Sequence, residues 1–147
     1  KNVAKFGECN RCDLSNADLR NGFYQLANMI EANLSGAKFD GSNMAGAQLN
    51  NANMSNGSFT YTNLSGAQLQ GADLRGANLS NAWLNWVWLA GAQLEGANFT
   101  GAKMIGAQLQ GADLSGVIGL TEIQLRNACG DSATRLPPGI TAPRCPF

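Results

Sequence analysis

The chain has 147 residues, a formal net charge of zero at pH 7, and charged side chains at 14% of its positions. The balanced charge argues against a nucleic-acid-binding protein, which normally carries a basic face, and against a polyanion that imitates DNA. The chain contains no histidine, so the commonest general base and the commonest metal ligand are missing. No apolar run is long enough to span a membrane as a helix.

The first segment, residues 1–11, is expected to cap the regular pattern that follows it, because a stack of repeats exposes its core at both ends. Residues 12–116 repeat every five positions without insertion. A large apolar residue recurs at 21 positions, as 13 Leu, 4 Met, 3 Phe and 1 Tyr. Two positions before it stands a small residue, which is Ala in 15 of 21 cases. Two positions after it stands Gly or Asn in 17 of 21 cases.

A period of five fits neither a helix nor a strand, but the spacing inside one unit explains it. Residues two apart lie on the same side of an extended segment, so the small and the large residue both point inward. The next step is three residues, which requires a turn, and Gly and Asn tolerate the positive φ that such a turn needs. Each unit therefore predicts one short side and one corner, and successive coils stack by parallel pairing about 4.8 Å apart.

The units ANLSG, AQLQG, ADLRG and ANLSN resemble the A(D/N)LXX unit of the pentapeptide-repeat proteins. The resemblance covers residues 12–116 and implies an all-β fold, a right-handed quadrilateral parallel β-helix of four units per coil and about five coils, ~25 Å tall. A coil of 20 residues would place Phe39, Phe59 and Phe99 in one column. It would also place three opposite-charge pairs one coil apart, namely Asp18–Lys38, Arg20–Asp40 and Arg75–Glu95.

Residues 117–147 are expected to form the C-terminal cap. The segment LTEIQLRNACG predicts a short helix, with Thr121 as its N-cap, Gln124 three residues later and Gly130 just past its end. The residues expected to close the last coil are Leu120, Ile123 and Leu125. The proline-rich remainder predicts an irregular tail, which resembles tails on some exported pentapeptide-repeat proteins.

Four cysteines allow three disulfide pairings. Two of them precede the stack and two follow it, so a height of ~25 Å leaves only Cys9–Cys12 and Cys129–Cys145. We interpret both as structural staples, which indicate an exported protein of the periplasm or thylakoid lumen. A redox or zinc role for CNRC and free thiols in a cytosolic protein are the alternatives. The chain begins with Lys1 rather than Met, which fits a removed secretory signal or a trimmed chain.

No catalytic, cofactor-binding or metal-binding residues are predicted. Asp13, Asp73 and Asp113 share one outward column, but the first two would stand ~14 Å apart on a flat side. The many Ser and Thr residues have no histidine to activate them. The glycines follow the five-residue corner pattern rather than forming a phosphate-binding loop. An enzyme is therefore disfavoured.

All three tryptophans lie in AWLNWVWLAG, residues 82–91. Trp83 and Trp88 precede large positions, and Trp86 takes a corner normally held by Gly or Asn, so all three are expected to point outward. The other aromatic members of this surface are Phe23 and Tyr61. The opposite two sides are expected to carry only polar, small or paired charged residues. An exposed aromatic patch indicates an interaction site. Alternatively, the rings pack on one another or beneath a terminal segment.

The leading hypothesis is a non-catalytic, exported structural and interaction module that presents the aromatic face to a protein partner or to another copy of itself. The resemblance suggests an alternative, because some family members imitate DNA in the cytoplasm and bind gyrase. Such mimicry needs a strongly negative surface, whereas residues 12–116 hold seven acids and four bases. Neither a nucleic acid nor a cofactor is expected as a partner.

Overall fold

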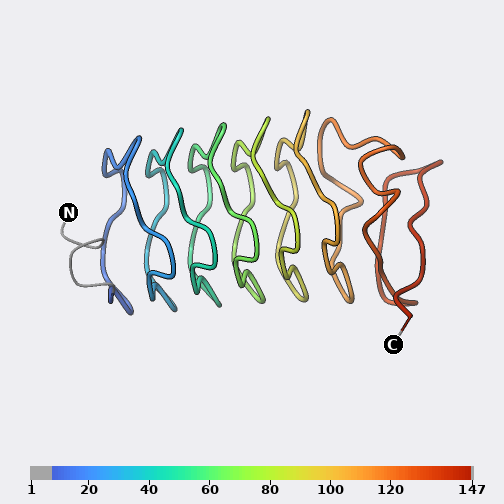
Figure 1. Cartoon of the computed structure of the whole chain (residues 1–147), viewed down its shortest axis with the longest axis horizontal. Helices are drawn as coiled ribbons and strands as arrows, with labels where there is room; N and C mark the ends of the chain where they lie inside the picture. The colour runs from blue at the N-terminus through green and yellow to red at the C-terminus, as the bar shows by residue number, and fades with distance from the viewer. Residues whose placement is uncertain (1–7, 147) are drawn as a thin grey trace.

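The computed structural model describes residues 8–146. The chain winds into a stack of similar coils, with the first and last coils at opposite ends (Figure 1). Parallel bridges join residues 20 positions apart, from Glu8–Asn28 to Asn98–Ile118. One coil therefore holds four five-residue units, as predicted, and the stack is a four-sided parallel β-helix.

Backbone hydrogen bonds between successive coils hold each side in place. Leu34 N donates to Asn53 O at 2.6 Å, and Asn53 N donates to Ala32 O at 2.9 Å. In every unit the bridge involves only the residue before the large one, so residues 8–146 contain isolated bridges and no longer strand or helix. This ladder satisfies the backbone polar groups that the narrow interior would otherwise leave unpaired.

The corners adopt the conformation that the Gly and Asn pattern predicts. Every fifth residue from Arg11 to Gly111 has a positive φ. At a representative corner Gly36 has a φ of 67°, and Ala37 N donates to Leu34 O at 3.0 Å to close the turn. The five-residue period therefore arises from one left-handed residue per unit.

The core consists of the small and large residues that point inward. The predicted phenylalanine column is confirmed, since Phe39, Phe59 and Phe99 are all fully buried. The rings of Phe39 and Phe59 stack with centroids 5.5 Å apart and planes 8° apart. Burial stabilises the fold by roughly 1.5–3 kcal/mol for each large side chain.

Two buried hydroxyl groups replace alanine in the core without being left unpaired. Ser42 Oγ donates to Leu19 O at 2.8 Å. Thr62 Oγ1 donates in the same way to Phe39 O at 2.9 Å. Each hydroxyl bonds a backbone carbonyl of the preceding coil, which offsets the cost of burying a polar atom.

The predicted C-terminal helix is wrong: residues 122–127 form consecutive hydrogen-bonded turns. Leu125 N bonds to Glu122 O and Arg126 N to Ile123 O, both with the three-residue spacing of tight turns. The segment is tied to the coil below, because the Gln124 side chain donates to Phe99 O and Ala102 O at 2.8 and 2.9 Å. Gly106 N also donates to Asn127 O at 2.7 Å. These attachments leave no room for helical turns.

Several local predictions for this segment have separate outcomes. The capping pair is present, since Thr121 N donates to Gln124 Oε1 at 2.7 Å, although it caps a turn. Leu120 and Leu125 are buried as predicted. Ile123 instead points into solvent, with 72% of its surface exposed, because the turn directs it outward. Gly130 ends no helix, since it forms a parallel bridge with Arg144.

The tail extends the stack irregularly and covers its C-terminal end. Arg135 forms a bridge with Asp113, so the chain makes one further pass along the coil. Three apolar side chains of the tail are half-buried against the core, namely Leu136, Ile140 and Ala142. At the other end, the predicted N-terminal cap covers residues 1–11, of which 1–7 lie outside the described residues. Residues 8–146 contain no helix of the length and apolarity needed to cross a membrane.

Candidate interaction surface

The four sides of the coil can be numbered in chain order. The third side comprises residues 22–25 and the fourth side residues 27–30, each with its equivalents 20 residues later. The corner between them is formed by residue 26 and its equivalents at 46, 66, 86 and 106. Trp83 lies on the third side, Trp86 at this corner and Trp88 on the fourth side. We call these three residues the aromatic corner.

The tryptophan side chains point away from the core. The exposed fractions are 46% for Trp83, 61% for Trp86 and 44% for Trp88. The inward positions around them are filled by Leu84 and Val87, which are fully buried. The rings are therefore not required to fill the core, and they project from two adjoining sides of the stack.

Trp86 has an unusual backbone conformation for a bulky residue, with a φ of 62°. The left-handed region costs an L-residue other than Gly or Asn about 1–2 kcal/mol. Its ring lies over Gly106 of the next coil, where an added Cβ would collide with the indole. The ring thus packs along the corner on bare backbone, and the fold accommodates it at a cost.

Lys103 approaches the neighbouring tryptophan from the next coil. Its ammonium nitrogen lies 6.0 Å from the centroid of the Trp83 ring. This distance is at the limit of a cation–π interaction, which at an exposed site is worth about 0.5–1 kcal/mol. The aromatic corner therefore carries one cation at its C-terminal edge.

Other exposed apolar side chains extend this surface toward the N-terminal end. Phe23 and Leu26 occupy the same columns as Trp83 and Trp86, three coils earlier, and each is 72% exposed. Tyr61, at the corner between the second and third sides, is 67% exposed and has a φ of 56°. All five aromatic residues of the predicted surface are therefore on the outside, and their role in binding stays a prediction.

The first and second sides carry a polar ladder. Asp113 Oδ1 accepts hydrogen bonds from Ser115 Oγ at 2.6 Å and from Ser115 N at 3.0 Å. Asn33 makes the same two bonds with Ser35. The Ser115 hydroxyl and backbone N–H lower the pKa of Asp113. One departure from the predicted polar surface is Ile118, an exposed residue of the second side.

The arginines form different ion pairs from those predicted. Arg20 contacts Asp18 at 2.7 Å and Arg75 contacts Asp73 at 2.7 Å, each within its own unit instead of one coil away. A carboxylate two residues away projects from the same side, so the guanidinium reaches it with two bonds. The Arg20 side chain holds the pKa of Asp18 down at about 2.

One ion pair between coils was missed by the sequence analysis. Arg11 Nε lies 2.8 Å from Glu31 Oε1, and both residues occupy corners. The same 20-residue spacing that suggested the other pairs could have found it. The missed apolar residue Ile118 could have been found in the same way, because its column otherwise contains Asn78 and Asn98.

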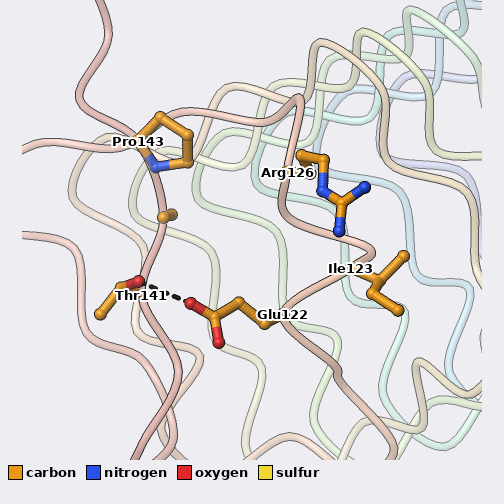
Figure 2. Close-up of a pocket in the computed structure, with 6 residues that line it drawn as sticks. Glu122, Ile123, Arg126, Thr141 and Pro143 are labelled. Atoms are coloured by element: carbon orange, nitrogen blue, oxygen red, sulfur yellow. Dashed lines mark hydrogen bonds between the residues drawn. The ribbon is translucent and has the colours of Figure 1, made fainter.

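A shallow groove lies between the C-terminal turns and the tail, with a volume of about 550 Å³. Figure 2 shows Glu122 Oε2 accepting a hydrogen bond from Thr141 across it, at 2.9 Å. Ile123, Arg126 and Pro143 line the remainder. Within residues 8–146 no three His, Cys, Asp or Glu side chains gather as metal ligands. The groove therefore presents one carboxylate, one guanidinium and apolar surface.

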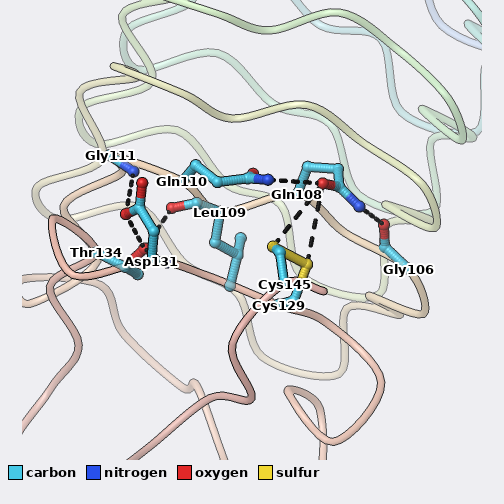
Figure 3. Close-up of a disulfide and its surroundings, with 9 residues drawn as sticks. All are labelled: Gly106, Gln108, Leu109, Gln110, Gly111, Cys129, Asp131, Thr134 and Cys145. Carbon is cyan, nitrogen blue, oxygen red and sulfur yellow. Dashed lines mark hydrogen bonds between the residues drawn. A yellow bond between two sulfur atoms is a disulfide. The ribbon is translucent and has the colours of Figure 1, made fainter. Parts of the chain in front are cut away.

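All four cysteines are joined in disulfides, Cys9 to Cys12 and Cys129 to Cys145. Figure 3 shows the second one beside Gln108, whose Oε1 lies 3.9 Å from each sulfur. Cys145 N donates to Gly130 O at 3.0 Å, so the bond fastens the tail to the last coil. The first disulfide closes the N-terminal unit, where Cys9 is buried.

Comparison with known proteins places the repeat in context. A family model described as pentapeptide repeats matches residues 8–44, 27–60, 58–87 and 77–116. No match was found among curated proteins. A solved pentapeptide repeat protein from the thylakoid lumen of Arabidopsis thaliana is 24% identical over 86% of this chain and 81% of that chain, with a TM-score of 0.63. This similarity concerns the fold.

Two further solved structures resemble the chain less well in three dimensions. A pentapeptide repeat protein from the cyanobacterium Cyanothece 51142 is 27% identical over 92% of this chain and 95% of that chain, with a TM-score of 0.33. QnrB1, a plasmid-mediated fluoroquinolone resistance protein, is 22% identical over 85% of this chain and 80% of that chain, with a TM-score of 0.32.

Proposed function

The chain belongs to the pentapeptide-repeat family, with its right-handed quadrilateral β-helix, and on this premise we propose that it is a non-catalytic interaction module. Its aromatic corner is presented to a protein partner or to another copy of the chain. The core needs none of the three tryptophans, because Leu84, Val87 and Leu89 already fill it. The rings are therefore available for contact.

The observation that carries the proposal is the backbone of Trp86. A corner that Gly or Asn would occupy at little cost holds a tryptophan at a φ of 62°, with most of its ring exposed. A strained residue persists where the surrounding fold imposes it, and such residues cluster at functional sites. Tryptophan is also enriched among the residues that dominate binding energy. Contact with a partner gives the costly side chain a purpose.

The two disulfides support an oxidising compartment, such as the periplasm or the thylakoid lumen. Thiol alkylation of protein from its native cell, without reductant, followed by intact mass measurement tests this. We expect no alkylated cysteine. Four alkylated cysteines would place the chain in a reducing compartment instead.

The surface charges support the interaction module over a DNA-imitating, gyrase-binding protein. Imitation of DNA requires a continuous negative field. Asp18 and Asp73 each have an arginine partner at 2.7 Å, which breaks that field on the first and second sides. Strong inhibition of gyrase supercoiling by the purified chain would reverse this ranking.

The test restores the repeat consensus with the triple variant Trp83→Asn, Trp86→Gly and Trp88→Asn. A matched control replaces three side chains of the first and second sides, Lys38→Gln, Gln93→Asn and Glu95→Gln. Both variants should fold, as measured by circular dichroism. The triple variant should lose partner capture from native extract and self-association in sedimentation, while the control keeps both. A folded triple variant that keeps both activities would refute the proposal.

A further inference from the structure

We propose that two copies of this chain pair antiparallel through the third side, so that Leu26 of each copy enters an unoccupied corner at Gly66 of the other. The inference rests on the proposed function, because it names a second copy as the occupant of the same surface. It extends that surface from the aromatic corner to Phe23 and Leu26.

The first argument is the spacing of the exposed apolar pairs. Phe23 is linked to Trp83 by successive bridges through Asn43 and Asn63, so three coils separate them. Leu26 and Trp86 have the same separation, about 14 Å along the stack. A twofold axis midway between these levels, perpendicular to the stack, brings the lower pair of each copy to the upper pair of the other. The interface is then isologous, as in most dimers.

The second argument is the shape of the corner. The Leu26 side chain lies over Gly46, where an added Cβ would come within 2.6 Å of it. At Gly66, by contrast, no atom lies within 4 Å of an added Cβ. The twofold axis sets Gly46 of one copy opposite Gly66 of the other. Leu26 therefore enters the open position at Gly66 of the second copy, next to Trp86 of that copy.

The corner between the second and third sides is complementary in the same register. The axis sets Tyr61 of one copy opposite Gly41 of the other. A large exposed ring thus meets a residue without a side chain. Small residues also face one another at the centre, where Ala45 meets Ser65 of the second copy.

The third argument is charge. From Asn21 to Trp86, the four levels of the third side and its two corners hold only uncharged side chains. The first and second sides, in contrast, carry the Asp18–Arg20 and Asp73–Arg75 ion pairs. Depletion of charge distinguishes the buried centre of an interface from ordinary surface. No like charges are brought together by pairing two copies of this side.

The area limits the affinity. Four levels span about 19 Å along the stack, and one extended side with its corners adds about 10–15 Å across it. The pair therefore buries roughly 1,000 Å² in total, at the small end of specific interfaces. We expect a reversible dimer with a Kd on the order of 10 µM.

Sedimentation equilibrium of the whole chain over a wide concentration range tests the pairing. The wild type should show a monomer–dimer equilibrium. Leu26→Asn should weaken it at least tenfold, because both copies lose the side chain that enters Gly66. Asn suits this corner, since Asn21 lies over Gly41 in the same way. The matched control is Ile118→Asn, an exposed aliphatic residue on the second side, which should leave the Kd unchanged.

Crosslinking tests the orientation. In the antiparallel register Gln25 of one copy faces Asn85 of the other, whereas two copies of either residue lie three coils apart. A short bismaleimide should therefore join a mixture of Gln25→Cys and Asn85→Cys chains several times more than either variant alone. All native cysteines are in disulfides, so the introduced thiol is the reactive one.

The outcomes separate this inference from the proposed function. A wild type that stays monomeric at millimolar concentration overturns the dimer, and so does a dimer that Leu26→Asn leaves unchanged. Predominantly self-joined Gln25→Cys or Asn85→Cys chains overturn the antiparallel register. In each case the tryptophans are intact, so loss of partner capture in the triple tryptophan variant would still support the proposed function.

Discussion

At residue 86 a single side chain connects local backbone geometry with the surface of the molecule. Its φ of 62° suits glycine, and its ring covers Gly106 one coil later. Gly106 therefore has two reasons to lack a side chain, its own φ of 71° and the indole above it. Gly111 has a similar φ of 70° but no atom within 4 Å of an added Cβ.

Alanine substitution at these two glycines should separate the two reasons. Gly111→Ala should lower the free energy of unfolding by about 1–2 kcal/mol, the cost of a left-handed alanine. Gly106→Ala should lower it further, because the new methyl group displaces the Trp86 ring. Denaturant unfolding of both variants measures the difference. In a Trp86→Gly background the two costs should become equal; a difference that persists there would mean that the ring does not pack on Gly106.

The Asp and Asn residues of the first side make the same bonds but differ in their response to pH. Asp113 has a pKa lowered by the Ser115 hydroxyl and N–H, below that of the unfolded chain near 4. Its contribution to stability is therefore present above about pH 4 and is lost as the pH falls through the folded pKa. Asn33 makes equivalent bonds to Ser35 without titrating.

Exchange of these two residue types should change the acid sensitivity in opposite directions. Asp113→Asn should reduce the fall in Tm between pH 7 and pH 2.5, because the amide oxygen keeps both Ser115 bonds. Asn33→Asp should enlarge that fall. Thermal melts at the two pH values measure both effects. Equal falls in the wild type and both variants would show that these carboxylate bonds add no pH-dependent stability.

At the scale of elements, the C-terminal tail depends on few attachments. Gly130 N donates to Pro143 O at 2.9 Å, and Cys145 N donates to Gly130 O at 3.0 Å. The Cys129–Cys145 bond spans 16 residues, whereas Cys9–Cys12 spans three. In the chain-entropy account a disulfide stabilises more when the loop that it closes is longer.

Removal of each disulfide should therefore have unequal effects. The Cys129→Ser/Cys145→Ser variant should lose about 3 kcal/mol of unfolding free energy, against about 2 kcal/mol for Cys9→Ser/Cys12→Ser. Hydrogen exchange should also accelerate at Gly130 and Cys145 in the first variant only. If that variant keeps wild-type exchange at both amides, the tail is held by contacts other than the disulfide.

The repeat could be predicted from the sequence because it depends on neighbouring residues. Inward Ala and Leu and a corner Gly or Asn define each unit within five positions, and the phenylalanine column then indicates the coil length. The C-terminal turns could not be predicted in this way. They depend on Gln124 reaching Phe99 O and Ala102 O, more than 20 residues earlier. The ion pairs of Arg20 and Arg75 likewise depended on side-chain conformations that spacing does not determine.

For the candidate surface, the sequence indicated which side chains point outward but not how they lie. Trp86 could be placed outside because it occupies a corner, whereas its position over Gly106 required coordinates. The open corner at Gly66 was also invisible in the sequence, since many corners are glycines. It becomes distinct only because Leu26 and Trp86 both lean over the glycine of the following coil.

At the scale of the whole molecule, the stack has two unlike halves. The first and second sides carry polar ladders and ion pairs, while the third and fourth sides carry the exposed rings. The same stack presents both halves, so association through one should leave the other accessible to solvent. The account therefore predicts which half is covered in the assembled protein.

Hydroxyl-radical footprinting measures this coverage most directly, since it reports the exposure of individual side chains. The isolated, dilute chain should be compared with the chain assembled with itself or its partner. The account predicts that Trp83, Trp86 and Trp88 become protected on assembly while Ile118 on the second side keeps its reactivity. Unchanged tryptophan reactivity together with protection of Ile118 would contradict the claim that the aromatic corner is the interaction surface.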